Sequence, residues 1–260
     1  MATEPRVYRY RIFPSEQQEV LFRQYAGARR FVYNHFLARS KTHYRATGKT
    51  LSFAALCREL TALKAKPATA WLRAMNGQSL QQAIRDLNRA FTNFFAGRAM
   101  FPRFKSKRRE RPSFRMPQYL TLDGAVLVVP KIGRVPLVLH RPAQGVLKSG
   151  TFRQDPTGAW DVSLVMEVAV VEGPLPPPDA TFAVGVDLGL KDLAVLSDGS
   201  HIAAPKHYRR AEKKLARLQR RLSRTQKAST NRTKLRAAVA RLHHRVASSA
   251  ARSSIGCPLV

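Results

Sequence analysis

The stretch Phe182–Gly199, which reads FAVGVDLGLKDLAVLSDG, decides the fold of the later part of this chain. It opens with an apolar run of strand length that ends at a carboxylate, Asp187. Gly189 follows closely, so the backbone can turn without a side chain that crowds the carboxylate. Leu193–Leu196 and His201–Ala203 predict two further strands with a tight turn between them. The stretch therefore predicts a small meander with an acidic residue near the end of its first strand.

Asp187 has two interpretations. An aspartate at the end of a strand is most often only a turn residue. A meander of this kind is also how RNase H-like nucleases begin, and their carboxylates hold two divalent metals that activate water for phosphodiester cleavage. The spacing alone favours the interpretation of Asp187 as a turn residue. The other parts of the chain therefore have to show whether a nuclease is the better interpretation.

The charge of the chain indicates a polyanionic partner. Its 260 residues include 46 Lys+Arg against 16 Asp+Glu, which gives a formal net charge of +30. The excess positive charges repel one another unless a polyanion neutralises them. Nucleic acid is therefore the first candidate partner and an anionic membrane surface the second. We expect no small-molecule substrate. Apolar runs such as Ala125–Val129 are too short to span a bilayer, and the N-terminal residues do not resemble a signal peptide. We therefore expect no membrane partner.

The cysteines and histidines predict no metal site. Cys57 and Cys257 show no paired spacing, which argues against a disulfide framework and against a four-ligand zinc site. His243 and His244 are neighbours that point to different helix faces, so we interpret them as surface residues. His35 lies beside an apolar stripe, and we interpret it as a packing residue.

The N-terminal part predicts one strand followed by helices. Ser15 has acidic residues in the turn after it, which is typical of a helix N-cap. Apolar residues then recur at helical spacing to about Tyr44, and Gly48 ends the segment. In chain order we predict a strand Arg6–Phe13, a helix from Ser15, a helix Phe53–Leu63, a short piece Ala70–Met75, a turn Asn76–Gly77 and a helix Ser79–Phe95. We interpret the aromatic stripe of the last helix as core.

A dense basic run, Gly97–Arg111, follows these helices and contains aromatic residues. Cations can neutralise phosphates and aromatic rings can stack on unpaired bases, whereas the alternative is a solvated loop without a partner. The charge of the whole chain favours nucleic-acid contact. The candidate contact residues are Arg103, Phe104, Lys105, Lys107, Arg108 and Arg109.

Short strands parted by Gly and Pro turns fill the segment Ser113–Val171, which is typical of a small barrel or sandwich. We expect the first strand of the chain to complete it. The predicted strands are Tyr119–Leu122, Val126–Val129, Val135–Leu139, Val146–Arg153 and Trp160–Val170. The proline-rich residues 174–181 then predict a stiff linker.

Two basic helices with narrow apolar seams are predicted between Lys206 and Arg252. The seams favour an antiparallel helical hairpin over a helix that lies on a membrane. They consist of Leu215, Leu218 and Leu222 in the first helix and of Leu235, Val239, Leu242 and Val246 in the second. The candidate nucleic-acid contacts of the first helix are Lys213, Lys214, Arg217, Arg220 and Arg221.

Several short sequence stretches follow one another in an order that is typical of one protein family. They are Tyr10–Pro14 (YRIFP), Ala28–Asn34 (ARRFVYN), Ser79–Leu87 (SLQQAIRDL), Phe101–Ser106 (FPRFKS), Gly185–Lys191 (GVDLGLK) and Ser197–Gly199 (SDG). In this order they resemble the TnpB (OrfB) proteins of bacterial insertion sequences, which are relatives of the type V CRISPR effector nucleases. TnpB proteins are RNA-guided DNA endonucleases, so the resemblance implies a guide RNA and DNA as partners and a cytoplasmic protein associated with the bacterial nucleoid.

The resemblance also implies the fold and the catalytic site. It implies an α+β multidomain fold, in which a wedge-like β-barrel (residues 1–13 and 113–173) carries an inserted helical recognition lobe (14–112). After the linker, residues 182–246 would form the first part of an RNase H-like (RuvC) domain with the basic helical hairpin. Asp187 would be the first catalytic carboxylate and a ligand of Mg²⁺.

This sequence departs from the family pattern near its end. A RuvC-type site needs a later glutamate and a final aspartate, and the family carries a four-cysteine zinc module. We expect these to be missing here, because Asp192, Asp198 and Glu212 lie on the early strands and the first helix. One carboxylate cannot hold two metals, so we expect Mg²⁺ not to be bound competently.

The tail, residues 247–260, loses the helical seam, and we expect it to be mobile and unpacked. A codon string compatible with the residues from Ser254 onward, read two nucleotides later, encodes His-Arg-Leu-Ser-Thr-Arg, which resembles the continuation of the family. We therefore predict a frameshifted tail. The gene downstream would test this.

The first functional hypothesis is thus a truncated TnpB-type protein that binds nucleic acid without cleavage. The alternatives are an active RNA-guided DNA endonuclease associated with transposition, for example one completed by a second fragment, and a nuclease-dead RNA-guided DNA-binding regulator. A basic ribosome-associated RNA binder is a further alternative, which the Asp187 motif and the helices argue against.

Overall fold

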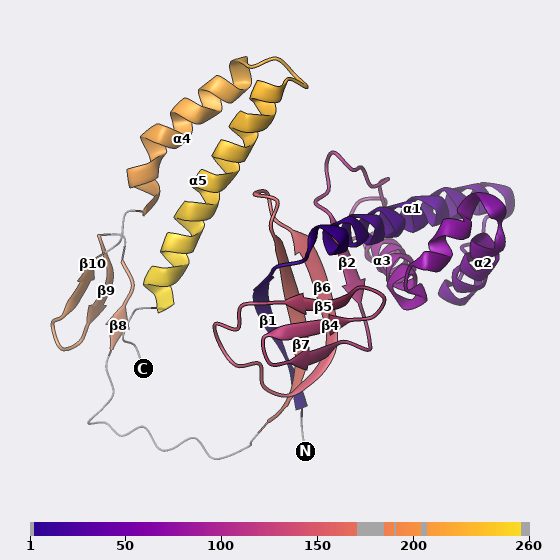
Figure 1. The fold of residues 1–260 in the computed structure, drawn as a ribbon, viewed down its shortest axis with the longest axis horizontal. Coiled ribbons are helices and arrows are strands. Elements are labelled where there is room, and N and C mark those ends of the chain that lie inside the picture. Colours follow the sequence, from indigo (N-terminus) through magenta and orange to yellow (C-terminus); the bar gives the residue numbers. More distant parts are fainter. Residues whose placement is uncertain (1–2, 171–184, 190, 204–206, 256–260) are drawn as a thin grey trace. The chain divides into compact units, whose positions relative to one another are not determined.

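The computed structural model describes residues 3–170, 185–189, 191–203 and 207–255, without the side chains at 207 and 250–255. The chain separates into two compact units, Met1–Val171 and Glu172–Val260, which Figure 1 shows as two groups of elements. The predicted linker, residues 174–181, lies outside the described residues, as do Phe182–Val184 of the predicted first strand of the meander.

The N-terminal unit begins with a strand and a long helix, as the sequence predicts. Strand β1 (Thr3–Ile12) leads into α1 (Glu16–Thr47). The Ser15 hydroxyl accepts a hydrogen bond from the Gln18 amide, while the Gln18 side chain accepts one from the Ser15 amide, so a capping box starts the helix. Gly48, at φ 65°, ends it in the left-handed conformation that glycine adopts without steric cost.

Two further helices and a 3₁₀ helix follow before the sheets. They are α2 (Phe53–Ala65), the 3₁₀ helix η1 (Pro67–Ala74) and α3 (Gly77–Phe95). The predicted turn at Asn76–Gly77 is wrong, because Gly77 is the first residue of α3. The side-chain oxygen of Asn76 accepts hydrogen bonds from the Gln78 and Ser79 amides and caps the helix.

The remaining strands of this unit form two antiparallel sheets. They are β2 (Ser113–Met116), β3 (Thr121–Asp123), β4 (Val126–Val129), β5 (Gly133–Pro136), β6 (Val146–Gln154) and β7 (Trp160–Ala169). One sheet has the order β1-β7-β6-β2 and the other β3-β4-β5, and a bridge between Ile12 and Leu137 links them. Figure 1 shows the β3–β5 strands beside the longer sheet. A closed barrel stays a prediction.

The sequence prediction located β4, β6 and β7 closely and missed one strand. The predicted strand Tyr119–Leu122 is displaced, since β3 spans Thr121–Asp123. Strand β2 was not predicted, because it is only four residues long and directly follows the basic run. Its alternation nevertheless buries Phe114 and Met116. In place of the predicted strand Val135–Leu139, the structure has β5, which is shorter and starts earlier, at Gly133. Pro136 is its last residue.

Helices and sheets of the N-terminal unit share one hydrophobic core. Phe22 of α1 is fully buried, with its ring centroid 5.3 Å from that of Phe114 in β2 and 4.9 Å from that of Trp160 in β7. Removing such a ring would cost about 3–5 kcal/mol. The sequence treated residues 14–112 as a separate lobe, but their first helix packs into the core of the sheets.

His35 has the packing role that the sequence predicts. Its ring stacks on Phe31 at a centroid distance of 6.0 Å and meets Phe36 edge-on at 5.1 Å. Burial lowers the pKa of its imidazole, so the neutral form is favoured among these rings.

The C-terminal unit consists of a meander and a helical hairpin. Strands β8 (Val186–Asp187), β9 (Asp192–Leu196) and β10 (His201–Ala203) pair antiparallel in the order β10-β9-β8. Helices α4 (His207–Arg224) and α5 (Thr230–Ile255) pack against each other, with Leu215 and Leu242 buried in the seam. Both the meander and the hairpin are confirmed. Among the described helices, none is long and apolar enough to cross a membrane.

The predicted end of the hairpin near Val246 is wrong. Helix α5 continues to Ile255, nine residues further than the apolar seam. The reason is that residues 247–251 read ASSAA, and alanine has the highest helix propensity, so a helix can continue there without an apolar period. Residues 256–260 lie outside the described residues. The frameshift stays a prediction.

Candidate nucleic-acid interface

Helix α4 carries a continuous row of cations. They recur at intervals of three and four residues, which places them on one side of a helix of 3.6 residues per turn. They line a shallow groove of about 680 Å³ and consist of Arg210, Lys213, Lys214, Arg217, Arg220, Arg221 and Arg224. All are exposed, and within the described part of the chain none of them forms an ion pair. Five of the seven are the candidates from the sequence, so the row is available to an external polyanion.

The helical hairpin has a cap that the sequence did not reveal. The Arg232 guanidinium, on α5, donates hydrogen bonds to the backbone carbonyl oxygens of Leu222 and Thr225 at 2.7 and 2.9 Å. These carbonyls belong to the last turn of α4 and the residue after it, where helical partners are missing. Arg232 is therefore structural, unlike the cations of the row on α4.

The basic run after α3 is fixed to helix α1 at one point. The Asn34 side chain donates to the Lys105 carbonyl oxygen at 2.9 Å and accepts from the Lys105 amide at 2.8 Å. Both backbone groups of Lys105 are thus satisfied by one side chain, as in a strand pair. This contact gives the run a defined position, although it contains no helix or strand between residues 98 and 112.

Lys105 differs from its neighbours in the candidate set. Its ammonium lies 4.5 Å from the centroid of the Tyr33 ring and 3.2 Å from a Glu110 carboxylate oxygen, and its side chain is 16% exposed. Its charge is therefore neutralised within the protein. By contrast, the other candidate residues of the run are exposed; these are Arg103, Phe104, Lys107, Arg108 and Arg109. In the described residues, none of the four cations among them has an ion-pair partner.

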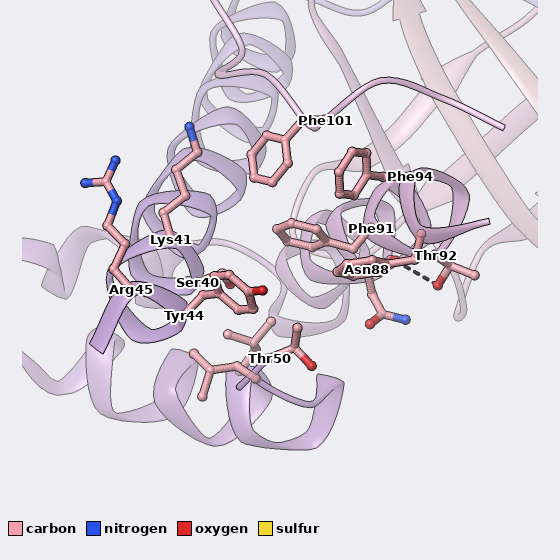
Figure 2. A pocket seen from close by; sticks show the side chains of 13 residues that line it. Ser40, Lys41, Tyr44, Arg45, Thr50, Asn88, Phe91, Thr92, Phe94 and Phe101 are labelled. Carbon is pink, nitrogen blue, oxygen red and sulfur yellow. Dashed lines mark hydrogen bonds between the residues drawn. The ribbon is translucent and has the colours of Figure 1, made fainter. Parts of the chain in front are cut away.

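The interpretation of the aromatic stripe of α3 as core is only partly right, because Phe91 packs against the core but the last turn of the helix leaves it. Leu80, Ala83, Ile84 and Leu87 are buried as expected, but Phe95 is 63% exposed. The last turns of α3 instead form one wall of a cavity of about 560 Å³, opposite α1 (Figure 2). The helix leaves the core there because the basic run, with Phe101 at its start, covers it in place of another helix.

Asp187 lies at the end of β8, exposed, with Val195 of β9 as its pairing partner. The Gly185 amide and carbonyl both bond to Ser197, at 2.9 and 2.8 Å, which fixes the start of the meander. Asp192 lies on the next strand, with its carboxylate 3.5 Å from His201 Nδ1. The described residues contain no group of three or more His, Cys, Asp or Glu that could hold a metal, so they do not fit a two-metal site.

Two family profiles match separate parts of the chain. One, described as "Probable transposase" (OrfB_IS605), matches residues 163–250, and one, described as "Helix-turn-helix domain" (HTH_OrfB_IS605), matches residues 3–49. A protein of Escherichia coli (strain K12) named "Putative RNA-guided DNA endonuclease InsQ" is 38% identical over 242 residues, which are 92% of this chain and 59% of that protein. The chain belongs to the TnpB (OrfB) family. This confirms the resemblance seen in the sequence.

Two further comparisons give the extent of the similarity. A Streptomyces pristinaespiralis protein named "Putative RNA-guided DNA endonuclease" is 34% identical over 93% of this chain and 60% of its own length. The chain therefore spans about 60% of the length of the curated relatives it matches. The solved Cas12f1–sgRNA–target DNA complex covers 95% of this chain and 76% of its own, with a TM-score of 0.47 and 11% identity. Residues 3–49, matched by the helix-turn-helix profile, fold here as β1 and α1.

Proposed function

We propose that this chain binds a guide RNA and its DNA target through sequence-independent contacts to their phosphates. The single observation that carries this proposal is the row of seven exposed cations on α4, which have no carboxylate partner in the described residues. A like-charged row of this kind is unfavourable unless a polyanion neutralises it. Sequence would then be read by base pairing between the guide and the target, while the protein holds the backbones.

The cation row provides the test. In one variant Lys213, Lys214, Arg217, Arg220 and Arg221 are replaced by Gln, and binding to a hairpin RNA is measured by fluorescence anisotropy at several salt concentrations. Each phosphate contact contributes about 0.7–0.9 to the slope of log affinity against log salt, so five lost contacts reduce the slope by about 4.

The matched control removes the same charge from arginines that are already paired. These are Arg6, Arg9, Arg23, Arg39 and Arg134, each with an aspartate or glutamate partner, all replaced by Gln. We expect this control to change the slope far less. Equal slopes for the two variants would mean that only net charge matters and that α4 is no interface.

We further propose that the chain by itself does not cut DNA. The support is that Asp187 is the only carboxylate that the family resemblance assigns, and that the described residues contain no group of three or more possible metal ligands. When bound, Mg²⁺ would supply water activation and charge stabilisation in such a site. Incubation with Mg²⁺, guide RNA and target duplex should leave the duplex intact.

A second candidate function is cleavage that requires residues beyond this chain. It is favoured by the exposed position of Asp187 at a strand end. Here Asp187 would be one of several ligands, the others being supplied by a second polypeptide. Adding the remaining part of a relative in trans should then restore cutting, and Asp187→Ala should abolish it.

A further inference from the structure

The cavity beside α3 has aromatic walls. It lies between the C-terminal turns of α1 and of α3, and Phe101 from the basic run covers one side of it (Figure 2). The ring of Phe101 stands nearly perpendicular to those of Phe91 and Phe94, with centroids 5.7 and 5.2 Å away. Its volume of about 560 Å³ lies within the range of roughly 300–1,000 Å³ that is typical of sites for small ligands.

The mouth of this cavity is cationic. Lys41 and Arg45 extend from α1, across the cavity from Phe91 and Phe94 of α3 (Figure 2). The Lys41 ammonium lies 5.0 Å from the ring centroids of both Phe101 and Phe104, so cation–π attraction holds it beside these rings. No acidic residue lines the cavity, and neither cation has an ion-pair partner among the described residues. The charge therefore suits an anionic occupant.

The cavity also contains polar groups that could read the edge of a planar ligand. Asn88 lies beside Phe91, and within the described structure its side-chain amide makes no hydrogen bond, although its backbone carbonyl accepts one from Thr92. An amide offers both a donor and an acceptor, which matches the mixed edge of a nucleobase. A purely apolar protein segment would leave these groups and the two cations without partners.

We propose that this cavity takes one unpaired nucleobase of a bound nucleic-acid strand, with the adjoining phosphate held by Lys41 and Arg45. The proposal rests on the nucleic-acid binding proposed above and adds to it a subsite for one base. The base stacks against the phenylalanine walls, while Asn88 contacts its edge. Duplex nucleic acid, whose bases are stacked and paired, cannot use the subsite.

The test uses a single-stranded DNA oligonucleotide that contains 2-aminopurine, a base whose fluorescence falls when it stacks. We expect the full chain to quench this fluorescence. Phe101→Ala and Phe101→Leu should both lose most of the quench and weaken single-strand binding by about tenfold, because leucine keeps apolar volume but offers no ring. Neither should alter binding to a blunt duplex. Lys41→Gln should keep the quench at saturation and reduce the salt slope by about 0.7.

Phe13→Ala is the control, because Phe13 is 56% exposed on the same unit but does not line the cavity. Circular dichroism and light scattering check folding and association for every variant. Normal binding without a quench, or a quench that both Phe101 variants retain, overturns the subsite and leaves the proposed function standing. Self-association that the Phe101 variants abolish, in the absence of a quench, assigns the cavity to a second copy and also overturns the subsite. Absence of any binding by the unaltered chain overturns both proposals.

Discussion

The two basic surfaces of this protein carry similar charge but are built differently. On α4 the cations recur with the helical period, and no aromatic residue stands between Arg210 and Arg224. In the basic run of the N-terminal unit, exposed cations alternate with Phe101 and Phe104, and Asn34 fixes the backbone. A regular row of charge can follow the phosphates of any strand, whereas rings among cations favour unpaired bases. Under the proposed function, we predict that the two surfaces prefer different nucleic acids, with a duplex held by the row of cations on α4 and a single strand held by the basic run.

The largest expected effect separates the two surfaces directly. Replacing Arg103, Lys107, Arg108 and Arg109 by Gln should reduce the salt slope for a single-stranded probe by about 3, since four phosphate contacts at about 0.7 each are lost. The same variant should change the slope for a duplex probe much less, and the α4 variant described above should show the opposite preference. If both variants lose both probes in the same proportion, the two surfaces are one undivided interface.

The next effect concerns how α4 is held. Arg232→Ala removes two hydrogen bonds from a charged donor to carbonyls at the end of α4, which should destabilise the hairpin by about 1.5–3 kcal/mol. Hydrogen exchange at the amides of α4 and α5 would measure this. Arg236→Ala removes the same charge from an exposed α5 residue with no hydrogen bond or ion pair in the described structure. Equal protection in the two variants would rule out the cap.

The corresponding change in the basic run is Asn34→Ala. It leaves the Lys105 amide and carbonyl without their partner, so we expect a loss of about 1–2 kcal/mol in local stability and a weaker single-strand affinity. Protection of the Lys105 amide against hydrogen exchange reports the contact. Asn93→Ala is the control, because the Asn93 side chain makes no hydrogen bond in the described residues. An Lys105 amide that stays protected would show that other contacts fix the run.

The smallest effect distinguishes two lysines that are neighbours in the run. Lys107→Gln should reduce the single-strand salt slope by about 0.7, as expected for one phosphate contact. Lys105→Gln should leave the slope nearly unchanged, because its ammonium is already neutralised by Glu110 and faces the Tyr33 ring. The same titration measures both variants. Equal slopes would mean that Lys105 leaves Glu110 when nucleic acid binds.

Local patterns predicted local structure well. The cap at Ser15 and the apolar seams of the hairpin depend on residues a few positions apart, and both are found. What the sequence could not give depends on distant partners. Asn34 and Lys105 are 71 residues apart, and nothing in either segment announces their contact. The same holds for Phe101, whose position over the end of α3 turns a stripe that was interpreted as core into a cavity wall.

Hydrogen bonds to backbone carbonyl oxygens were a second feature that the sequence analysis missed. Arg232 is one of many cations in the C-terminal unit, and its role is not evident from the sequence, because carbonyl oxygens leave no signature there. The end of α5 was missed for the opposite reason, since alanine and serine show no apolar period and yet continue a helix. The role of Asp187 was inferred from a family resemblance, and the described residues contain no group of three or more possible metal ligands that would test it.

The contact between Asn34 and Lys105 has a consequence for chain length. It divides the connection between α3 and β2 into two shorter loops, each closed at a fixed point. Because the entropy of closing a loop grows only slowly, by about 0.6 kcal/mol for each doubling of its length, either half could gain residues at little thermodynamic cost. An insertion near Gly97 or near Arg111 would leave the anchored middle in place, whereas one beside Lys105 would displace it. Length variation among related sequences should therefore concentrate at the two ends of this connection.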